Sequence, residues 1–403
     1  MSDTALKIGI VVIGYNRVDC ISRLLDRLNA CDYPSGDIPL VISLDNCGKD
    51  DVLNYTMKYD WIHGEKTVIH QPERLGLKKH ILKCGGYMDE YGWDAQIMLE
   101  DDVYTSTAFY SFAMQTVKKY HDDNNIAGIS LYSMPQNQTV RLPFSPIDSE
   151  SDVFFMQLAQ SWGQIWMRKS WHEFIAWYDE NSETFTECEG VPFNVCRWPE
   201  SSWLKYHIRY CIEKNKYFVY PYVSLTTCFS DVGVHTQSKS HALQTPLQTE
   251  SKEYTLPELI AGRKYDAWCE NLAIKDVLCV DDVCVDIYGA KKNYAGNRYW
   301  LTTLPKPYRI ERSFGMELRP VDMNVLCGLP GNEIFLYDTQ EEAPAPEVAD
   351  RDISMFNYYN NLLYPDEAIK KIAKPMFDKI RKNRIRLLRH PAKLCRKIVK
   401  GLK

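Results

Sequence analysis

Hydrophobic and polar positions alternate in blocks over the first hundred residues. Short apolar runs are followed by longer stretches in which apolar residues recur at helical spacing, as in Cys20–Leu28. A continuous, mostly β-branched run such as Ile8–Ile13 is typical of a parallel strand that is buried on both faces. The predicted strands are Ile8–Ile13, Leu40–Leu44, Thr67–Ile69 and Gln96–Leu99. Strands that alternate with helices predict an α/β fold with a mostly parallel sheet and right-handed crossovers.

Polar side chains follow each of these predicted strands. Arg17 comes after the first strand, Asp45 after the second, Arg74 after the third, and Glu100-Asp101-Asp102 directly after the fourth. Ligands of open α/β sheets bind beyond the carboxyl ends of the strands, so we expect these residues to share one site. The chain has neither a G-x-G-x-x-G turn after the first strand nor a P-loop. A nucleotide bound here would therefore need side chains and a metal ion to neutralise its phosphates.

The three consecutive acids after the fourth strand are the strongest local signal. Ionised carboxylates at Glu100, Asp101 and Asp102 repel one another, which costs free energy unless a cation or hydrogen-bond donors compensate. Oxygen ligands at a strand end suit Mg²⁺ or Mn²⁺, which keep open positions for substrate phosphates. An ordinary acidic loop is the alternative, and the triplet alone does not decide between the two.

Four segments of the N-terminal part carry a resemblance to a known family. The sequences IGIVVIGYNR, SLDNCG, Gln71–Gly76 and MLEDDV resemble the N-terminal half of GT-A fold glycosyltransferases, over roughly residues 8–240. The chain most resembles the N-acetylglucosaminyltransferase that initiates complex N-glycan branching and its bacterial family 2-like relatives. The resemblance implies a Rossmann-like fold with a mixed, mostly parallel sheet and flanking helices, and it favours the metal interpretation of the acid triplet.

The resemblance also implies roles for individual residues. Arg17 matches the arginine that contacts the donor diphosphate, and Asp45 matches the acid that bonds the uracil edge, which implies a UDP-sugar donor. Glu100 and Asp101 correspond to acids that face the ribose and the donor sugar. Asp102 corresponds to the metal ligand.

Three further positions match the family more loosely. Arg74 and the pair Lys78 and Lys79 lie where such enzymes close over the nucleotide, although a solvated helix start explains the lysines equally well. His235, in the segment that resembles the closing loop, corresponds to a second metal ligand or a phosphate donor. A lone histidine is more often structural.

The catalytic base is expected before a helix in the middle of the chain. Glu200 precedes a predicted helix that runs to about Lys214, at the place where the family has a catalytic carboxylate, usually Asp. An acid at this position can also be a simple helix cap. Glu187 and Glu189 are the alternative bases. Six of the ten tryptophans lie nearby, between residues 154 and 203, a density that is more typical of a core than of an acceptor cleft.

The composition is that of an ordinary soluble globular protein, with 403 residues of which 45% are hydrophobic and 25% charged. No run of about eighteen apolar residues occurs, so no membrane-spanning helix is expected. The polar start, Met1–Lys7, lacks the regions of a secretion signal. The thirteen cysteines are scattered without a C-x-x-C pair, which favours reduced thiols and a cytoplasmic protein.

The net charge of −5 hides an uneven distribution along the chain. Residues 370–403 hold fourteen Lys and Arg against one acid, a net charge of +13. Residues 1–369 keep 34 basic and 52 acidic residues, a net charge of −18. Apolar residues at helical spacing in the tail predict a basic amphipathic helix on an anionic membrane surface. A solvated helix, or one packed on the acidic body, is the alternative, and we expect no nucleic-acid partner.

These patterns divide the chain into four expected segments. Residues 1–240 form the GT-A catalytic domain, with a nucleotide-binding half (1–105) and an acceptor half (106–240). Residues 241–340 form an extension of unknown role. Residues 341–350 are an acidic, Pro-rich linker, and residues 351–403 are the membrane-associating tail.

The sequence thus predicts a glycosyltransferase that transfers a hexosyl or N-acetylhexosaminyl group with the help of Mn²⁺ or Mg²⁺. We expect an inverting enzyme that uses a UDP-sugar, sits at the inner face of a membrane, and modifies a glycan or lipid-linked acceptor in surface polysaccharide synthesis. A retaining transferase, or a noncatalytic membrane-docking protein with the same fold, remains open.

Overall fold

The structure is a computed structural model that describes residues 6–34, 36–185, 188–229, 231, 241–292, 294, 296–348, 351–360 and 374. The chain divides into two compact units, Met1–Pro346 and Glu347–Lys403. In the second unit the structure describes residues 347–348, the helix α11 (Arg351–Asn360) and Lys374. Of the tail that was predicted to bind a membrane, residues 351–403, only α11 and Lys374 are therefore described. In the described part of the chain no helix combines the length and apolar character needed to cross a bilayer.

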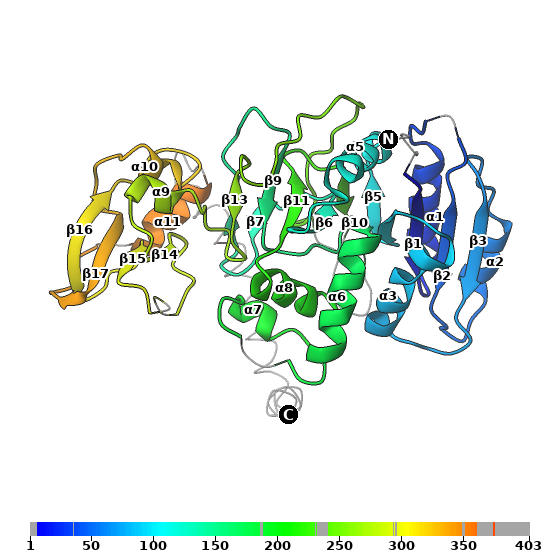
Figure 1. Cartoon of the computed structure of the whole chain (residues 1–403), viewed down its shortest axis with the longest axis horizontal. Helices are drawn as coiled ribbons and strands as arrows, with labels where there is room; N and C mark the ends of the chain where they lie inside the picture. Colours follow the sequence, from blue (N-terminus) through cyan, green and yellow to red (C-terminus); the bar gives the residue numbers. More distant parts are fainter. Residues whose placement is uncertain are drawn as a thin grey trace. The chain divides into compact units, whose positions relative to one another are not determined.

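A nine-stranded sheet forms the centre of the larger unit (Figure 1). Five of its neighbouring pairs are parallel and three are antiparallel, so the predicted α/β fold with a mostly parallel mixed sheet is confirmed. In spatial order the strands are β13 (Lys264–Tyr265), β9 (Val153–Met156), β11 (Tyr217–Pro221), β6 (Ile126–Ser130), β10 (Gln164–Met167), β4 (Ala95–Glu100), β1 (Ile8–Gly14), β2 (Leu40–Leu44) and β3 (Lys66–His70).

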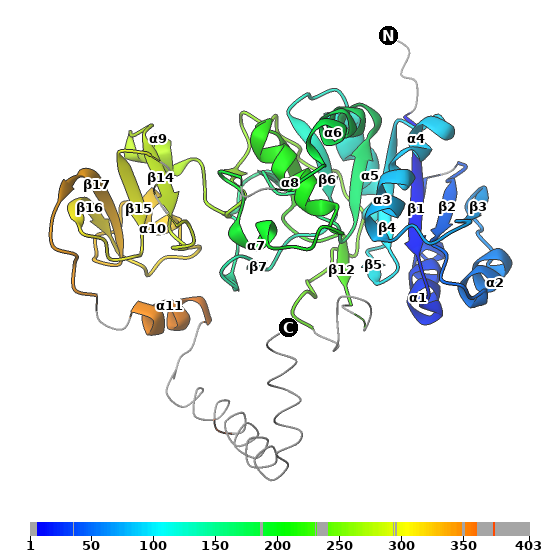
Figure 2. The same cartoon turned by 90° about the horizontal axis from the view of Figure 1, so that it is seen from below.

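Helices cover both faces of this sheet. Figure 2 shows α1 (Val18–Asn29) and α2 (Asp51–Lys58) on one side of β1–β3, and α4 (Tyr87–Glu90) on the other. Side chains of α1, of α5 (Phe109–Tyr120) and of one face of β1 belong to the same apolar core. Two helices follow β3, α3 (Leu77–Gly85) and α4, and Gly86 lies between them.

The tryptophan-rich region is core, as its density indicated. Trp166 and Trp171 stack with ring centroids 3.9 Å apart, and Trp203 meets Trp166 edge-on at 5.5 Å. All three are buried. Trp166 comes from β10, and Trp171 comes from the first turn of α6 (Arg168–Asn181). Trp203 directly precedes α8 (Leu204–Glu213). The short helix α7 (Phe193–Cys196) lies between α6 and α8 along the chain. Trp162 and Trp198 are half-buried and line a small cavity of about 100 Å³.

The extension folds around its own four-stranded sheet. Its strands, in spatial order, are β14 (Val283–Asp286), β15 (Tyr299–Thr302), β17 (Ile334–Glu342) and β16 (Tyr308–Phe314), with the short helices α9 (Ile274–Leu278) and α10 (Met323–Leu326). β17 continues through Glu342, into the stretch that the sequence suggested as a linker, because Glu342 pairs with Tyr308. Two small ribbons complete the unit: β5 (Val103–Thr105) with β12 (Thr226–Cys228), and β7 (Gln136–Asn137) with β8 (Leu142–Pro143).

Candidate active site

A cavity of about 400 Å³ lies at the carboxyl ends of β1, β2 and β4. The residues around it come from the turns that follow β1, β2, β3 and β4, from the start of α3, and from two later segments that supply Ser201 and Asp231. Six of the residues that the sequence suggested for donor and metal binding line it, namely Arg17, Asp45, Arg74, Glu100, Asp101 and Asp102, whereas Lys78 and Lys79 do not.

The parallel pairing of the strands explains why these residues meet. Gly14 at the end of β1 pairs with Leu44 at the end of β2, and Ile13 pairs with Glu100 at the end of β4. The next residues of all three strands therefore leave the sheet at the same edge. Arg17 precedes α1 in an extended conformation, which ends the turn after β1.

Arg17 binds the acid triplet directly. Its Nε donates a hydrogen bond to Asp101 Oδ2 at 3.1 Å, and its terminal nitrogen pairs with Asp101 Oδ1 and lies 3.5 Å from Asp102 Oδ2. Burial opposes the charge of Arg17, but the hydrogen bond and the charges of Asp101 and Asp102 keep its pKa above the ordinary value. The turn after β1 is thus fastened to the end of β4 by a charged, bidentate contact.

One arginine does not balance three carboxyl groups. Burial, together with the charges of Asp102 and Asp101, raises the pKa of Glu100 to about 8. Burial raises the pKa of Asp101 to about 6, although Arg17 acts in the opposite direction. The ionised cluster is therefore costly by itself, and a cation beside it would lower that cost.

The carboxylates of the cavity fit one common mode of Mg²⁺ or Mn²⁺ binding. Among the described residues no group of three Asp, Glu, His or Cys side chains forms a ready-made metal site. Mg²⁺ and Mn²⁺, however, commonly use one or two carboxylates and complete their shell with water and substrate phosphates. Asp102 fits this use, because Arg17 is bonded chiefly to Asp101 and the Asp102 side chain is 18% exposed at the cavity.

Asp45 has a second task besides the predicted contact with a base. Its Oδ1 accepts hydrogen bonds from the backbone N–H groups of Leu75, at 2.7 Å, and Asn46, at 3.0 Å, and its Oδ2 accepts one from Gly76 at 2.9 Å. Gly76 has a positive φ of 75° and precedes α3. Asp45 therefore holds the turn that begins α3, and its Oδ2 keeps capacity for one more donor.

Several residues of the cavity, among them Tyr15, His80 and Asp231, were missed in the sequence. His80 is buried, and its Nε2 lies 2.8 Å from Ser43 Oγ on β2. Burial lowers the pKa of His80 to about 4, so the ring is neutral at physiological pH. Tyr15 carries the guanidinium of Arg74 over its ring, 5.4 Å from the centroid. His80 lies four residues after Gly76, about one helical turn, and this spacing was the sequence signal that could have placed its ring near the start of α3.

Glu200 lies beside the cavity, and its neighbour Ser201 is the residue that lines it. The Glu200 side chain is 69% exposed, with Oε1 accepting from the buried Lys205 Nζ at 2.6 Å and Oε2 from the Tyr206 hydroxyl at 3.0 Å. The hydrogen bond from Lys205 lowers the pKa of Glu200. Lys78 Nζ donates to the backbone carbonyl of Glu200 at 3.4 Å, so it braces this loop.

The remaining candidates fall elsewhere. Glu189 lines a different, larger cavity. Lys79 is exposed on α3 and is absent from the residues that line the donor cavity. Glu187 and His235 lie outside the described residues.

Neither a protein-family model nor a curated protein matches the chain. Among solved structures it is similar to S. aureus TarS 1-349 in complex with UDP-GlcNAc, with 15% identity, a TM-score of 0.37, and coverage of 57% of this chain and 60% of that one. It is similar to the mannosyltransferase PcManGT from Pyrobaculum calidifontis with GDP-Man and Mn²⁺, with 14% identity, a TM-score of 0.33, and coverage of 55% and 58%. It is also similar to GalNAc-T7 with UDP, GalNAc and Mn²⁺, with 12% identity, a TM-score of 0.38, and coverage of 55% of this chain and 43% of that one.

The chain thus spans about 60% or less of each of these proteins. All three are glycosyltransferases, whereas the finer resemblance to the N-glycan branching enzyme has no counterpart among them and stays a prediction. The fold is therefore assigned from the strand order of this chain and not from these similar structures.

The raised pKa of Glu100 generates a prediction about stability. A carboxyl group whose pKa is higher in the folded than in the unfolded chain costs stability as pH rises from its unfolded value toward about 8. In EDTA, Glu100→Gln should therefore stabilise the protein at about pH 8.5, by at least about 1 kcal/mol, and much less near about pH 5. Thermal unfolding at both pH values measures this. The exposed Glu90→Gln is the control, and a pH-independent difference for Glu100→Gln would contradict the prediction.

Proposed function

We propose that the protein is a metal-dependent glycosyltransferase that moves a hexosyl or N-acetylhexosaminyl group from a UDP-sugar to a glycan or lipid-linked acceptor. The observation that carries the proposal is the convergence of six residues, separate in the sequence, on one cavity at the carboxyl ends of β1, β2 and β4. An acidic cavity of this kind would repel the diphosphate of a nucleotide sugar. A divalent cation on the acids resolves that conflict.

The chain's own residues divide the work of donor binding. Arg17 contacts the diphosphate while it stays paired with Asp101, and Asp102 would hold Mn²⁺ or Mg²⁺. When bound, the ion would neutralise charge on the departing UDP. Asp45 orders the turn before α3 and offers Oδ2 to the N–H edge of a uracil, near the neutral His80. His235 is kept as a second ligand or phosphate donor on the sequence alone.

In the inverting mechanism Glu200 accepts the proton of the acceptor hydroxyl. The hydroxyl oxygen attacks the anomeric carbon, the bond to the diphosphate breaks, and UDP leaves with the bonding electrons. A lowered pKa keeps Glu200 ionised, which a base needs, but makes it a weaker base. To act, the carboxylate must exchange one of its bonds to Lys205 and Tyr206 for the acceptor.

The hydrogen bonds of Glu200 to Lys205 and Tyr206 also favour a second candidate function, a retaining transferase in which Glu200 is structural. Lys205→Met discriminates between the two. If Glu200 is the base, removal of Lys205 raises its pKa and moves the acid limb of the kcat/KM profile to higher pH, because Lys205 stabilises the ionised form. The exposed Lys214→Met should leave the limb in place. An unmoved limb for Lys205→Met, with retained anomeric configuration of the product by NMR, would assign the retaining mechanism.

A screen for UDP release over common nucleotide sugars, with and without Mn²⁺, tests the activity directly. Asp102→Ala should lower turnover by at least about 100-fold and remove the effect of Mn²⁺, because the main carboxylate for the ion is lost. The exposed Asp122→Asn, on the loop after α5, is the control with a similar loss of charge. Unchanged UDP release by Asp102→Ala would contradict the metal role of Asp102, whereas no UDP release by the wild type with any donor would favour the noncatalytic docking protein.

We also propose that the basic tail, residues 370–403, places the enzyme on the inner face of an anionic membrane, where surface polysaccharides are built on lipid-linked acceptors. The support is the net charge of +13 and the helical spacing of the apolar residues in this segment. In liposome flotation with anionic lipid, the full chain should float and a chain of residues 1–369 should not. Equal behaviour of the two chains would reject the proposal.

A further inference from the structure

A second cavity, of about 890 Å³, lies between the nine-stranded sheet domain and the C-terminal extension. Glu189, Phe193 and Trp268 line it from one side, and Lys275, Lys292 and Asn297 from the other. We propose that this cavity binds an anionic oligosaccharide, the acceptor of the transfer. The proposal rests on the proposed function, because it assigns the acceptor of that reaction.

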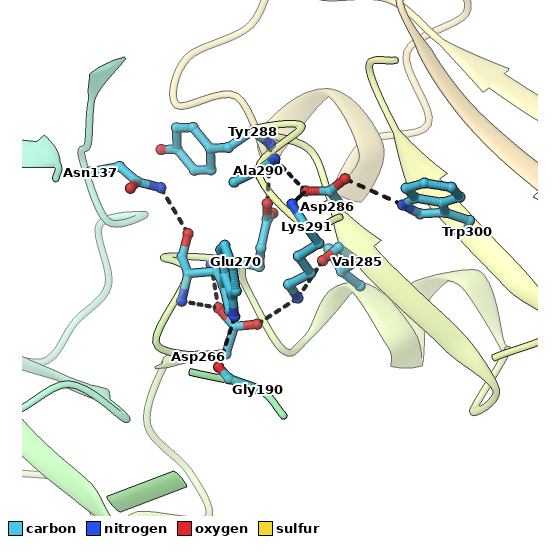
Figure 3. Close-up of polar contacts among 11 residues, drawn as sticks. Asn137, Gly190, Asp266, Glu270, Val285, Asp286, Tyr288, Ala290, Lys291 and Trp300 are labelled. Atoms are coloured by element: carbon cyan, nitrogen blue, oxygen red, sulfur yellow. Dashed lines mark hydrogen bonds and ion pairs between the residues drawn. The ribbon is translucent and has the colours of Figure 1, made fainter. Parts of the chain in front are cut away.

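Buried polar contacts hold the two sides of the cavity together (Figure 3). Lys291 Nζ donates to Asp266 Oδ2 at 2.8 Å and to the carbonyl of Val285 at 2.7 Å, and Glu270 Oε1 accepts from the backbone N–H of Tyr288 at 3.0 Å. Asp266 and Glu270 follow β13, whereas Val285, Tyr288 and Lys291 belong to β14 and the turn after it. Contacts of this kind fix the extension against the strand, so the cavity is a lasting feature of the fold.

Trp268, which also follows β13, makes hydrogen bonds to two other segments of the chain. Its Nε1 donates to the carbonyl of Gly190 at 2.8 Å, and its own carbonyl accepts from Asn137 Nδ2 at 2.8 Å. The segment around Gly190 therefore forms a fixed wall of the second cavity.

The charges that line the cavity favour an anion. Lys275 is half-buried and, within the described residues, makes no ion pair, and Lys292 is exposed at the rim. Within the lining, Asp266 is paired with Lys291, so three lysines stand against two acids, Asp266 and Glu189. Asp282, which is not part of the lining, also interacts with the charge of Lys275. Residues 1–369 carry a net charge of −18, so a lysine-lined cavity stands out from an acidic body.

The other lining groups suit a saccharide. The side-chain amides of Gln157 and Asn297 can bond hydroxyl groups, and Asn297 already donates to Asp282 Oδ1 at 2.9 Å, which orients it. The half-buried ring of Phe193 offers an apolar surface to a sugar face. The volume lies within the range of pockets that enclose ligands larger than a single sugar.

One segment links this cavity to the donor cavity. Residues 188–191 and Phe193 line the second cavity, Pro192, Asn194 and Trp198 line the small cavity beside it, and Ser201 lines the donor cavity. An extended acceptor that follows this segment would have its anionic part at the lysines and its reacting end near Glu200.

Saturation-transfer NMR with three hexasaccharides of different charge tests the proposal: hexagalacturonate, phosphorylated maltohexaose and neutral maltohexaose. The full chain should bind at least one of the two anionic probes and not the neutral one, and the two anionic arms distinguish carboxylate from phosphate recognition. Lys275→Glu/Lys292→Glu should weaken that binding by about tenfold or more, because it reverses the charge of the lining. Lys58→Glu, exposed on α2, is the matched control and should bind as the wild type does.

Calorimetry of UDP with Mn²⁺ on the same proteins separates this proposal from the proposed function. UDP should bind the wild type and the double variant equally, because neither lysine lines the donor cavity. If the wild type fails to bind UDP, the proposed function fails. The second cavity is not an anionic-saccharide site if UDP binds but the anionic probes do not bind, or if they bind no better than maltohexaose. The same conclusion follows if the anionic probes bind the double variant as well as they bind the wild type. If the double variant does not fold, the single variant Lys292→Glu, at an exposed position, replaces it in the same binding measurements.

Discussion

The contact between Arg17 and Asp101 is the one on which the candidate site depends. It fastens the turn after β1 to the end of β4 and neutralises one acid of three. The remaining charge is expensive, as the pKa of Glu100, about 8, indicates. An anionic donor would add to this cost, and in the proposed function a divalent cation offsets it. This electrostatic constraint, more than any single hydrogen bond, connects the fold to the proposed chemistry.

The sequence predicted the first half of the sheet and the residues at its edge. Continuous apolar runs mark β1, β2 and β4, and residues that follow parallel strands must meet at one edge, so Arg17 and Asp102 could be placed together in advance. The second half of the sheet could not be derived, because β9 pairs with both β11 and β13 and such pairing depends on tertiary contacts.

Individual roles within the site were also only partly predictable. The resemblance pointed to Asp45 but not to its hydrogen bonds with the backbone of Leu75 and Gly76, which depend on where the turn before α3 lies. It pointed to Glu200, yet the partner Lys205 is five residues away, outside the usual helical spacing of three or four, and is visible only in the fold. The extension gave no functional signal, because its cavity is formed together with residues far away in the sequence.

The most direct test of the account is a crystal structure of the protein with UDP and Mn²⁺. The account predicts the diphosphate in the cavity at the ends of β1, β2 and β4, in contact with Arg17, with Mn²⁺ between the phosphates and Asp102. Nucleotide bound elsewhere, or bound there with no ion at the acids and no contact to Arg17, would contradict it.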